Sequence, residues 1–180
     1  LDLSITRLDE VIGDLNNILQ LRVQIDEPKK YIDLKNLILD IQVSISNTIA
    51  NIEVDIQTNF NSCTEIKSIK SYLYSIFYNL ISNSIKYRKQ EKKLIIQISS
   101  SISKNHIELI YQDNGIGIDL FKNGNQVFGL YKRFHLNQAE GKGVGLYMVK
   151  TQVEALGGSI SIESEINKGT EFKIQFPLPV

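Results

Sequence analysis

The stretch Glu140–Lys150 reads EGKGVGLYMVK and places three glycines at alternate positions, directly before an apolar pattern with helical spacing: Gly141, Gly143 and Gly145. Glycines ahead of a helix often let backbone amides approach a phosphate. A P-loop is ruled out because Gly143 follows Gly141-Lys142 and Leu136 stands at the first glycine position. A Rossmann turn fails because Leu146 stands at its third glycine position. The rest of the chain has to identify the kind of phosphate site.

The composition describes an ordinary globular chain without a charged partner. Twenty Lys and Arg residues balance twenty Asp and Glu residues over 180 positions, and no basic stripe is present, so nucleic acid is not an expected partner. The single cysteine, Cys63, excludes an internal disulfide and a cysteine-based zinc site. No apolar run approaches the ~20 residues of a membrane helix. We expect a cytoplasmic domain, and membrane attachment of the parent protein stays open.

The first 24 residues carry an apolar stripe with alternating spacings of four and three: Leu1, Ile5, Leu8, Ile12, Leu15 and Leu19. This heptad-like pattern predicts one long helix that packs on another helix, from a second copy or from a part of the protein not in this chain. The alternative is that the stripe covers the domain that follows. Residues 25–31 contain a proline in a polar run and are predicted to be a linker, which makes 32–180 the main domain.

Periodicity beyond the linker predicts helices and strands in a mixed order. Asp33 can cap a helix with its apolar face at Leu34, Leu37, Ile38, Ile41 and Ile45. We then expect a strand over 52–56, a helix over about 70–88, paired strands over 93–102 and 106–113, a long loop over 120–140, a helix over 144–156 and a closing hairpin of two strands. Strands joined mostly by hairpins, with helices on one side, predict an α+β fold: a two-layer α/β sandwich.

The segment NLISNSIKY, residues 79–87, places polar side chains on one helix face. Asn79, Asn83 and Lys86 are three or four residues apart and therefore share that face. A neutral amide oxygen such as that of Asn83 suits a Mg²⁺ ion that takes its negative ligands from phosphates. The alternative is a pair of solvated or hydrogen-bonded asparagines, and this segment alone does not decide between them.

The segment DNGIGID, residues 113–119, follows a predicted strand and turns sharply at its glycines. Asp113 at the strand end can accept a hydrogen bond from an exocyclic amine such as adenine N6. A hydrogen bond to a charged acceptor contributes about 1.5–3 kcal/mol, which is enough to distinguish adenine from guanine. An ordinary turn is the alternative, and a calcium loop is excluded because Gly115 stands at its third position.

Five segments in order give the chain a specific resemblance. NLISNSIKY, DNGIGI, VFGLYKRF, GKGVGLYMVK and NKGTEF follow the order and spacing of the N, G1, F and G2 boxes and the closing G-T turn of sensor histidine kinases. The chain resembles the ATP-binding domain of that family from Tyr31 to its end. The wider superfamily includes Hsp90, type II topoisomerases and MutL. The resemblance implies the sandwich fold of that superfamily and the binding of ATP with Mg²⁺.

The resemblance also implies roles for single residues. Asn83 would coordinate Mg²⁺ with Asn79 supporting the phosphate end, Lys86 would contact phosphate, and Tyr87 would line the nucleotide. Asp113 would read adenine, with room given by Gly115 and Gly117 and a hydrogen bond from Thr170 nearby. Residues 120–140 would form a mobile lid that includes Phe128 and Arg133. The phosphates would lie against the segment that begins the last helix: Gly141, Gly143, Val144, Gly145 and Leu146.

One position separates kinases from ATPases in this superfamily. The ATPases carry a glutamate where this chain has Asn79, and an amide cannot act as a general base. We therefore expect phosphoryl transfer to a protein, with Asn79, Lys86 and Arg133 acting at the γ-phosphate. The only histidines, His106 and His135, do not lie on the N-terminal helix, so the acceptor histidine is expected on a separate dimerisation helix. A homodimeric parent and a response regulator are the implied partners, and a non-catalytic, nucleotide-gated signalling scaffold is the alternative.

Overall fold

The computed structural model describes residues 27–131 and 143–178, and these residues form one layer of helices on one main sheet. The main sheet holds β2 (Val54–Asn59), β4 (Leu94–Ile102), β5 (His106–Asp113), β6 (Ser159–Glu165) and β7 (Gly169–Pro177) in the order β2-β4-β5-β7-β6. β2 pairs with β4 in parallel, and the other neighbours are antiparallel. The register sets Asp113 at the end of β5 opposite Thr170 at the start of β7.

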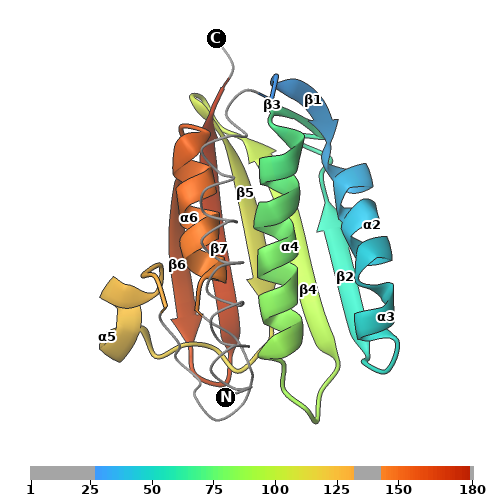
Figure 1. Cartoon of the computed structure of the whole chain (residues 1–180), viewed down its shortest axis with the longest axis vertical. Helices are drawn as coiled ribbons and strands as arrows, with labels where there is room; N and C mark the ends of the chain where they lie inside the picture. Colours follow the sequence, from blue (N-terminus) through green and yellow to red (C-terminus); the bar gives the residue numbers. More distant parts are fainter. Residues whose placement is uncertain (1–26, 132–142, 179–180) are drawn as a thin grey trace, which may run out of the picture.

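Three helices cover the same face of this sheet: α2 (Leu34–Ser44), α4 (Lys70–Lys86) and α6 (Gly145–Ala155). Figure 1 shows α4 in the middle, with α2 on one side and α6 on the other. The two-layer α/β sandwich expected from the sequence is confirmed for the described residues. The long helix predicted over residues 1–24 lies outside them. Within the described part of the chain, no helix has the length and apolar character needed to cross a bilayer.

The core lies between α4 and the sheet, because α4 carries an apolar face on three-and-four spacing. Leu73, Phe77, Leu80 and Ile81 of that face are completely buried. Burying each such side chain contributes about 1.5–3 kcal/mol. The adjacent helix α2 begins as predicted, because the Asp33 side chain accepts a 2.7 Å hydrogen bond from the backbone N–H of Asn36. These contacts fix α4 on the sheet, and α4 carries the predicted site residues Asn79, Asn83 and Lys86.

The structure adds short elements that the sequence did not predict. β1 (Lys30–Asp33) and β3 (Glu65–Ser68) form a separate two-stranded antiparallel sheet, and β1 extends across the predicted end of the linker at residue 31. A short helix α3 (Ser46–Ile49) follows α2. The predicted loop over 120–140 begins with α5 (Leu120–Asn123) and the 3₁₀ turn η2 (Gly124–Gln126).

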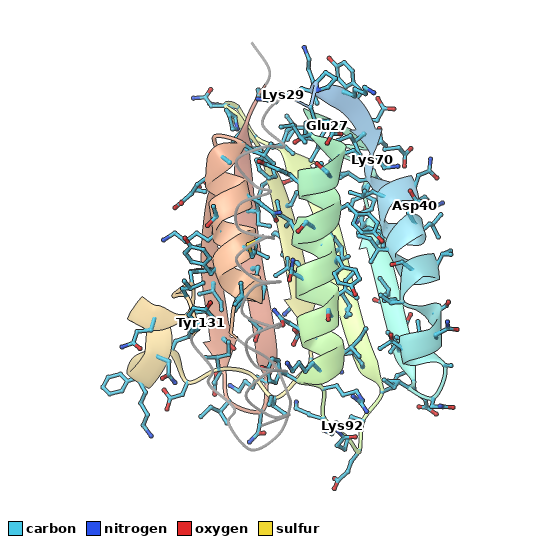
Figure 2. The ribbon with its side chains drawn as sticks, in the orientation of Figure 1. Glu27, Lys29, Asp40, Lys70, Lys92 and Tyr131 are labelled. Atoms are coloured by element: carbon cyan, nitrogen blue, oxygen red, sulfur yellow. The ribbon has the colours of Figure 1, made fainter. Side chains whose placement is uncertain are left out.

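The hydroxyl of Ser71, in the first turn of α4, donates a 2.6 Å hydrogen bond to Glu27, which Figure 2 labels beside that end of the helix.

Candidate functional site

The predicted phosphate end lies where α4 meets the beginning of α6. The two asparagines of α4 face Gly145, the first residue of α6. A Cβ atom added to Gly145 would lie 3.0 Å from Asn79 Oδ1 and 3.6 Å from Asn83 Nδ2. Gly145 is not at a positive φ, so its lack of a side chain is needed for this close approach of the helices and not for backbone conformation. The structure therefore brings Gly145 beside two asparagines that are more than sixty positions earlier in the sequence.

The first turn of α6 presents backbone N–H groups that the side chain of its N-cap residue does not cap. Val144 is the N-cap residue, and its apolar side chain makes no capping hydrogen bond. The four N–H groups that begin a helix have no partner within it, and the helix dipole favours an anion beside them. Val144 is buried and Leu146 packs against the core, so both anchor the helix end in place. Gly143 precedes this turn with φ +73°, a conformation that favours glycine.

Lys86 and Tyr87 end α4 on the side where the chain turns toward the predicted adenine site. The Lys86 ammonium lies 5.5 Å from the centroid of the Tyr87 ring, within the range of a cation–π contact. The backbone carbonyl of Tyr87 accepts a 3.0 Å hydrogen bond from the N–H of Ile116. This bond ties the end of α4 to the glycine loop after β5, which places both segments of the resemblance in one region.

Asp113 is held in place by hydrogen bonds to both of its carboxylate oxygens. Its Oδ2 accepts a 2.6 Å hydrogen bond from the Ser84 hydroxyl, and its Oδ1 accepts a 2.8 Å bond from the N–H of Gly115. The backbone of Thr170 also hydrogen-bonds to this carboxylate. Burial raises the pKa of Asp113, although these bonds and the charge of Lys89 act in the opposite direction.

Ser84 was not predicted from the sequence, and it connects α4 to Asp113 through the core. Its hydroxyl lies 2.8 Å from the Tyr111 hydroxyl and 2.6 Å from Asp113 Oδ2. A serine hydroxyl has one proton, and the Asp113 carboxylate at 2.6 Å is a stronger acceptor than the Leu80 carbonyl at 3.2 Å. Ser84 therefore donates to Asp113 and accepts from Tyr111. Burial raises the pKa of Tyr111 well above its ordinary value, which keeps this donor protonated. The only signal in the sequence was a serine on the apolar face of α4, four residues after Leu80.

The glycine loop after β5 is held against the hairpin of β6 and β7. Gly117 has φ +71°, and a Cβ there would collide with the carbonyl of Glu165. The Ser164 hydroxyl accepts a 2.8 Å hydrogen bond from the N–H of Ile118 and lies 2.9 Å from the hydroxyl of Thr170. Thr170 is buried in this arrangement. The G-T turn, which had no functional meaning by itself, is thus packed on the loop that carries Asp113.

Asn114, also missed by the sequence, fixes the other side of the same loop. Its Oδ1 accepts a 2.9 Å hydrogen bond from the N–H of Ile95, and its Nδ2 donates a 3.0 Å bond to the carbonyl of Lys93. These bonds join the loop to the beginning of β4. Gly115 follows, and a Cβ there would lie 2.8 Å from the carbonyl of Tyr87. The loop therefore has no room for a side chain on the face that meets α4.

The segment before the undescribed part of the predicted lid contacts the sheet through Phe128. Its ring packs edge-on against Phe172 of β7 with centroids 6.5 Å apart, and Phe172 in turn contacts Tyr111. The Lys150 ammonium of α6 lies 5.8 Å from the Phe128 ring centroid. Phe128 is thereby placed on the same side as α6. Arg133 and Gly141, the remaining predicted site residues, lie outside the described residues.

The arrangement suits a magnesium ion that arrives with phosphates. Among the described residues no group of three His, Cys, Asp or Glu side chains is placed to hold a metal by itself. The phosphate end instead offers the neutral amides of Asn79 and Asn83 beside an uncapped helix N-terminus. Mg²⁺ prefers oxygen ligands, keeps several waters and commonly shares substrate phosphates. The amide groups at this end therefore fit a Mg²⁺ ion that takes its negative ligands from phosphates.

The comparisons with known proteins identify the family of this chain. The chain belongs to the family of histidine kinase-, DNA gyrase B- and HSP90-like ATPases, whose model matches residues 69–180. Within this family it is a sensor histidine kinase catalytic domain, and membership implies ATP binding. It is 36% identical to the sensor protein RprX of Bacteroides fragilis over 110 residues, 59% of this chain and 21% of RprX.

Two further similarities extend over more of the chain. The sensor histidine kinase GraS of Staphylococcus haemolyticus is 30% identical over 151 residues, 80% of this chain and 41% of GraS. The fold matches the Acinetobacter baumannii histidine kinase AdeS with a TM-score of 0.76 and 18% identity, over 98% of this chain and 81% of that structure. The chain thus spans less than half the length of RprX and GraS. We therefore treat the activity of the whole protein as a proposal.

Proposed function

We propose that this chain binds Mg-ATP and transfers the γ-phosphoryl group to a histidine on a separate dimerisation helix that is not part of the chain. The observation that carries the proposal is the meeting of Asn79 Oδ1, Asn83 and the uncapped N-terminus of α6 at Gly145. Backbone N–H groups, neutral amides and the positive end of a helix are the groups that bind a polyphosphate without supplying a base.

At the adenine end, Asp113 is the proposed acceptor for the exocyclic amine. Its carboxylate is oriented by Ser84, Gly115 and Thr170, so little conformational entropy is lost when a base binds. Gly117 gives the loop its turn, and Tyr87 and Phe128 are proposed to supply aromatic surface to the nucleotide. A guanine presents a carbonyl where adenine presents this amine, so two hydrogen-bond acceptors would face each other at the buried carboxylate.

At the phosphate end, Asn83 and Lys86 are proposed to hold the charged groups of the substrate. Mg²⁺, when bound, neutralises charge on the β- and γ-phosphates during transfer. Lys86 adds a positive charge one turn from Asn83, and Val144 with Leu146 keeps the N–H groups of α6 aimed at the phosphates. Catalysis then depends on position and charge more than on proton transfer by the protein. Arg133 and the glycines at 141 and 143 complete this end in the proposal.

The transfer step replaces a phosphorus–oxygen bond with a phosphorus–nitrogen bond. An imidazole nitrogen of the acceptor attacks the γ-phosphorus, the bond to the β–γ bridging oxygen breaks, and ADP leaves with that electron pair while the imidazole proton passes to solvent. Water competes poorly with this acceptor because Asn79 cannot deprotonate it. Slow hydrolysis lets bound ATP wait for the histidine.

The remaining partners of the proposal follow from the same reaction. The acceptor histidine is supplied by the same or a sister protomer of a homodimeric parent, and the phosphoryl group then passes to a response regulator. The apolar stripe at Leu1–Leu19 would belong to the dimerisation helix, with the domain located in the cytoplasm. Nucleic acid is not a partner in this scheme.

The first test is calorimetric titration of the chain with Mg-ATP and Mg-GTP. We expect ATP binding in the wild type and a loss of at least tenfold in affinity for Asp113→Ala. Asp40→Ala serves as the matched control, since Asp40 is exposed and its ion pair among the described residues is with Lys70 (Figure 2). Failure of the folded wild type to bind ATP would refute the proposal.

A second measurement separates transfer from hydrolysis and from a signalling scaffold. The chain is mixed with Mg-ATP and a histidine-bearing dimerisation domain, and acid-labile phosphate on that domain is measured. Transfer with little release of free phosphate supports the proposal. Steady ATP turnover without an acceptor would assign the chain to the ATPases, and nucleotide binding without either reaction would assign it to the scaffold.

A further inference from the structure

A buried glutamine interrupts the apolar contact between α4 and α6. Gln152 is 2% exposed, and its neighbours on the inner face of α6 are the apolar residues Met148, Val149 and Val153. A buried amide is unfavourable unless both its polar atoms find partners. Gln152 Oε1 has none among the described residues, so the side chain is not explained by stability alone.

The nitrogen of the Gln152 amide bonds to Ser75 of α4, which also accepts a hydrogen bond from Asn79. Gln152 Nε2 donates a 2.9 Å hydrogen bond to the hydroxyl oxygen of Ser75. Asn79, one turn further along α4, donates from its Nδ2 to the carbonyl of Ser75 at 2.8 Å and toward the same hydroxyl at 3.4 Å. Ser75 is therefore the common acceptor for an amide from each helix, and Figure 1 shows those two helices side by side.

These bonds decide which end of the Asn79 amide faces the phosphate end. Because the nitrogen is turned back toward Ser75, the oxygen is the atom that lies beside Gly145. If the amide rotated by half a turn, it would present two N–H donors there and no acceptor for a metal-bound water. The orientation of the Asn79 amide thus decides whether this position offers a hydrogen-bond acceptor or donors to a bound ligand.

We propose that Gln152 is a positioning residue, which through Ser75 holds the oxygen of Asn79 toward the bound Mg-ATP. The effect of Gln152 on Mg-ATP binding rests on the proposed function. The orientation of Asn79 does not, because it is a property of the nucleotide-free protein. Gln152 also keeps α6 in register with α4, so that the uncapped N-terminus of α6 and the Asn79 oxygen approach the same phosphate.

The test uses Gln152→Met, which keeps the length and burial of the side chain and removes its hydrogen bond. The variant should melt at the same temperature as the wild type or higher, because an unpaired buried oxygen is removed. The Mg²⁺ concentration for half-maximal ATP binding should rise about two- to tenfold, the loss expected for one net hydrogen bond. Met148→Leu, a volume-conserving change elsewhere on the inner face of α6, is the control and should change neither quantity.

A spectroscopic readout tests the orientation without nucleotide. The side-chain amide resonances of Asn79 should shift, and its amide hydrogens should exchange faster, in Gln152→Met and not in Met148→Leu. Ser75→Ala should reproduce both changes, and the double variant should be no worse than Ser75→Ala because the two residues act through one contact. Ser75→Ala also decides the matter if Gln152→Met does not fold.

The outcomes separate the inference from the proposed function. If the wild type binds Mg-ATP but neither the Asn79 resonances nor the Mg²⁺ requirement moves in the variants, Gln152 has no positioning role and the inference is overturned. If the wild type does not bind Mg-ATP, the proposed function fails, while the Asn79 resonances still show whether Gln152 orients the amide.

Discussion

Replacing Gly145 with alanine should separate nucleotide binding from stability, because the added methyl group enters the gap between α4 and α6. The new Cβ would lie 3.0 Å from Asn79 Oδ1 and 3.6 Å from Asn83 Nδ2. Favourable contacts between heavy atoms lie near 3.5–4.0 Å, so the Asn79 amide has to move by about 0.5 Å. The perturbation is therefore directed at the amides proposed to face the phosphates, and it leaves the apolar core unchanged.

The expected change in stability is small because two terms oppose one another. Alanine in place of glycine stabilises a helix by up to about 1 kcal/mol. Displacing Asn79 weakens its 2.8 Å bond to the Ser75 carbonyl, which costs about 0.5–1.5 kcal/mol. We expect the free energy of unfolding to change by less than about 1 kcal/mol in either direction, as measured by urea denaturation.

The expected change in binding is larger and has one direction. Loss of one well-placed contact to Mg-ATP corresponds to about 1.4 kcal/mol, or about a tenfold weaker Kd by calorimetry. Gly124→Ala is the matched control, since a Cβ there meets only Leu120 at 3.9 Å and the backbone is helical. Unchanged affinity in a folded Gly145→Ala variant would show that the phosphates do not lie between Asn79 and α6.

The remaining predictions concern the loop after β5. Burial raises the pKa of Asp113 in the folded protein above its unfolded value of about 3.9. The stability that the protonated carboxyl contributes is therefore fully present below the unfolded pKa. It is lost as the pH rises through the folded pKa. Asp113→Asn should flatten that part of a pH series of urea melts, and ATP binding by the wild type should weaken as the pH falls through the same range. Ser84→Ala should weaken ATP binding about two- to tenfold in calorimetry by removing the donor to Asp113 Oδ2, and an unaltered Kd would deny Ser84 that role. Gly117→Ala should lower the free energy of unfolding by at least about 1–3 kcal/mol, because it combines φ +71° with a collision at Glu165, and a wild-type melting temperature would contradict the loop geometry.

The main helices and the main sheet were predictable because their patterns are long. α4 carries four turns of apolar spacing, and β4, β5 and β7 each alternate buried and less buried residues over eight or nine positions. The two strands of the small sheet have four residues each, with Ile32 as the one buried residue of β1. A pattern of four residues is too short to separate a strand from other local structure, even where it alternates as in β3. The pairing of these two strands joins residues more than thirty positions apart, which no local pattern reports.

Some residues of the candidate site were predictable from the sequence and others were not, for a similar reason. Glycines and asparagines in ordered motifs were visible because few other residues allow sharp turns or close approach. Ser84, Asn114 and Gln152 were not visible because a polar side chain in a sequence is equally compatible with solvent, and its partner lies on another element. Only the packing of the elements shows that Ser84 and Gln152 are buried, that Ser84 bonds to Asp113, and that Gln152 bonds to Ser75. It also shows that Asn114 bonds to the backbone of β4 and the residue before it.

The buried polar groups explain why one helix can serve both ends of the nucleotide. α4 directs Ser84 toward Asp113 and directs Asn79 toward α6, and these residues are five positions apart on faces that differ by more than a quarter turn. A shift of α4 along the sheet would therefore disturb the adenine contact and the phosphate contact together. It follows that Ser84→Ala and Gly145→Ala should affect binding independently while α4 stays in place, so their effects on the binding free energy should add. Strong non-additivity in the double variant would instead mean that either substitution moves the whole helix.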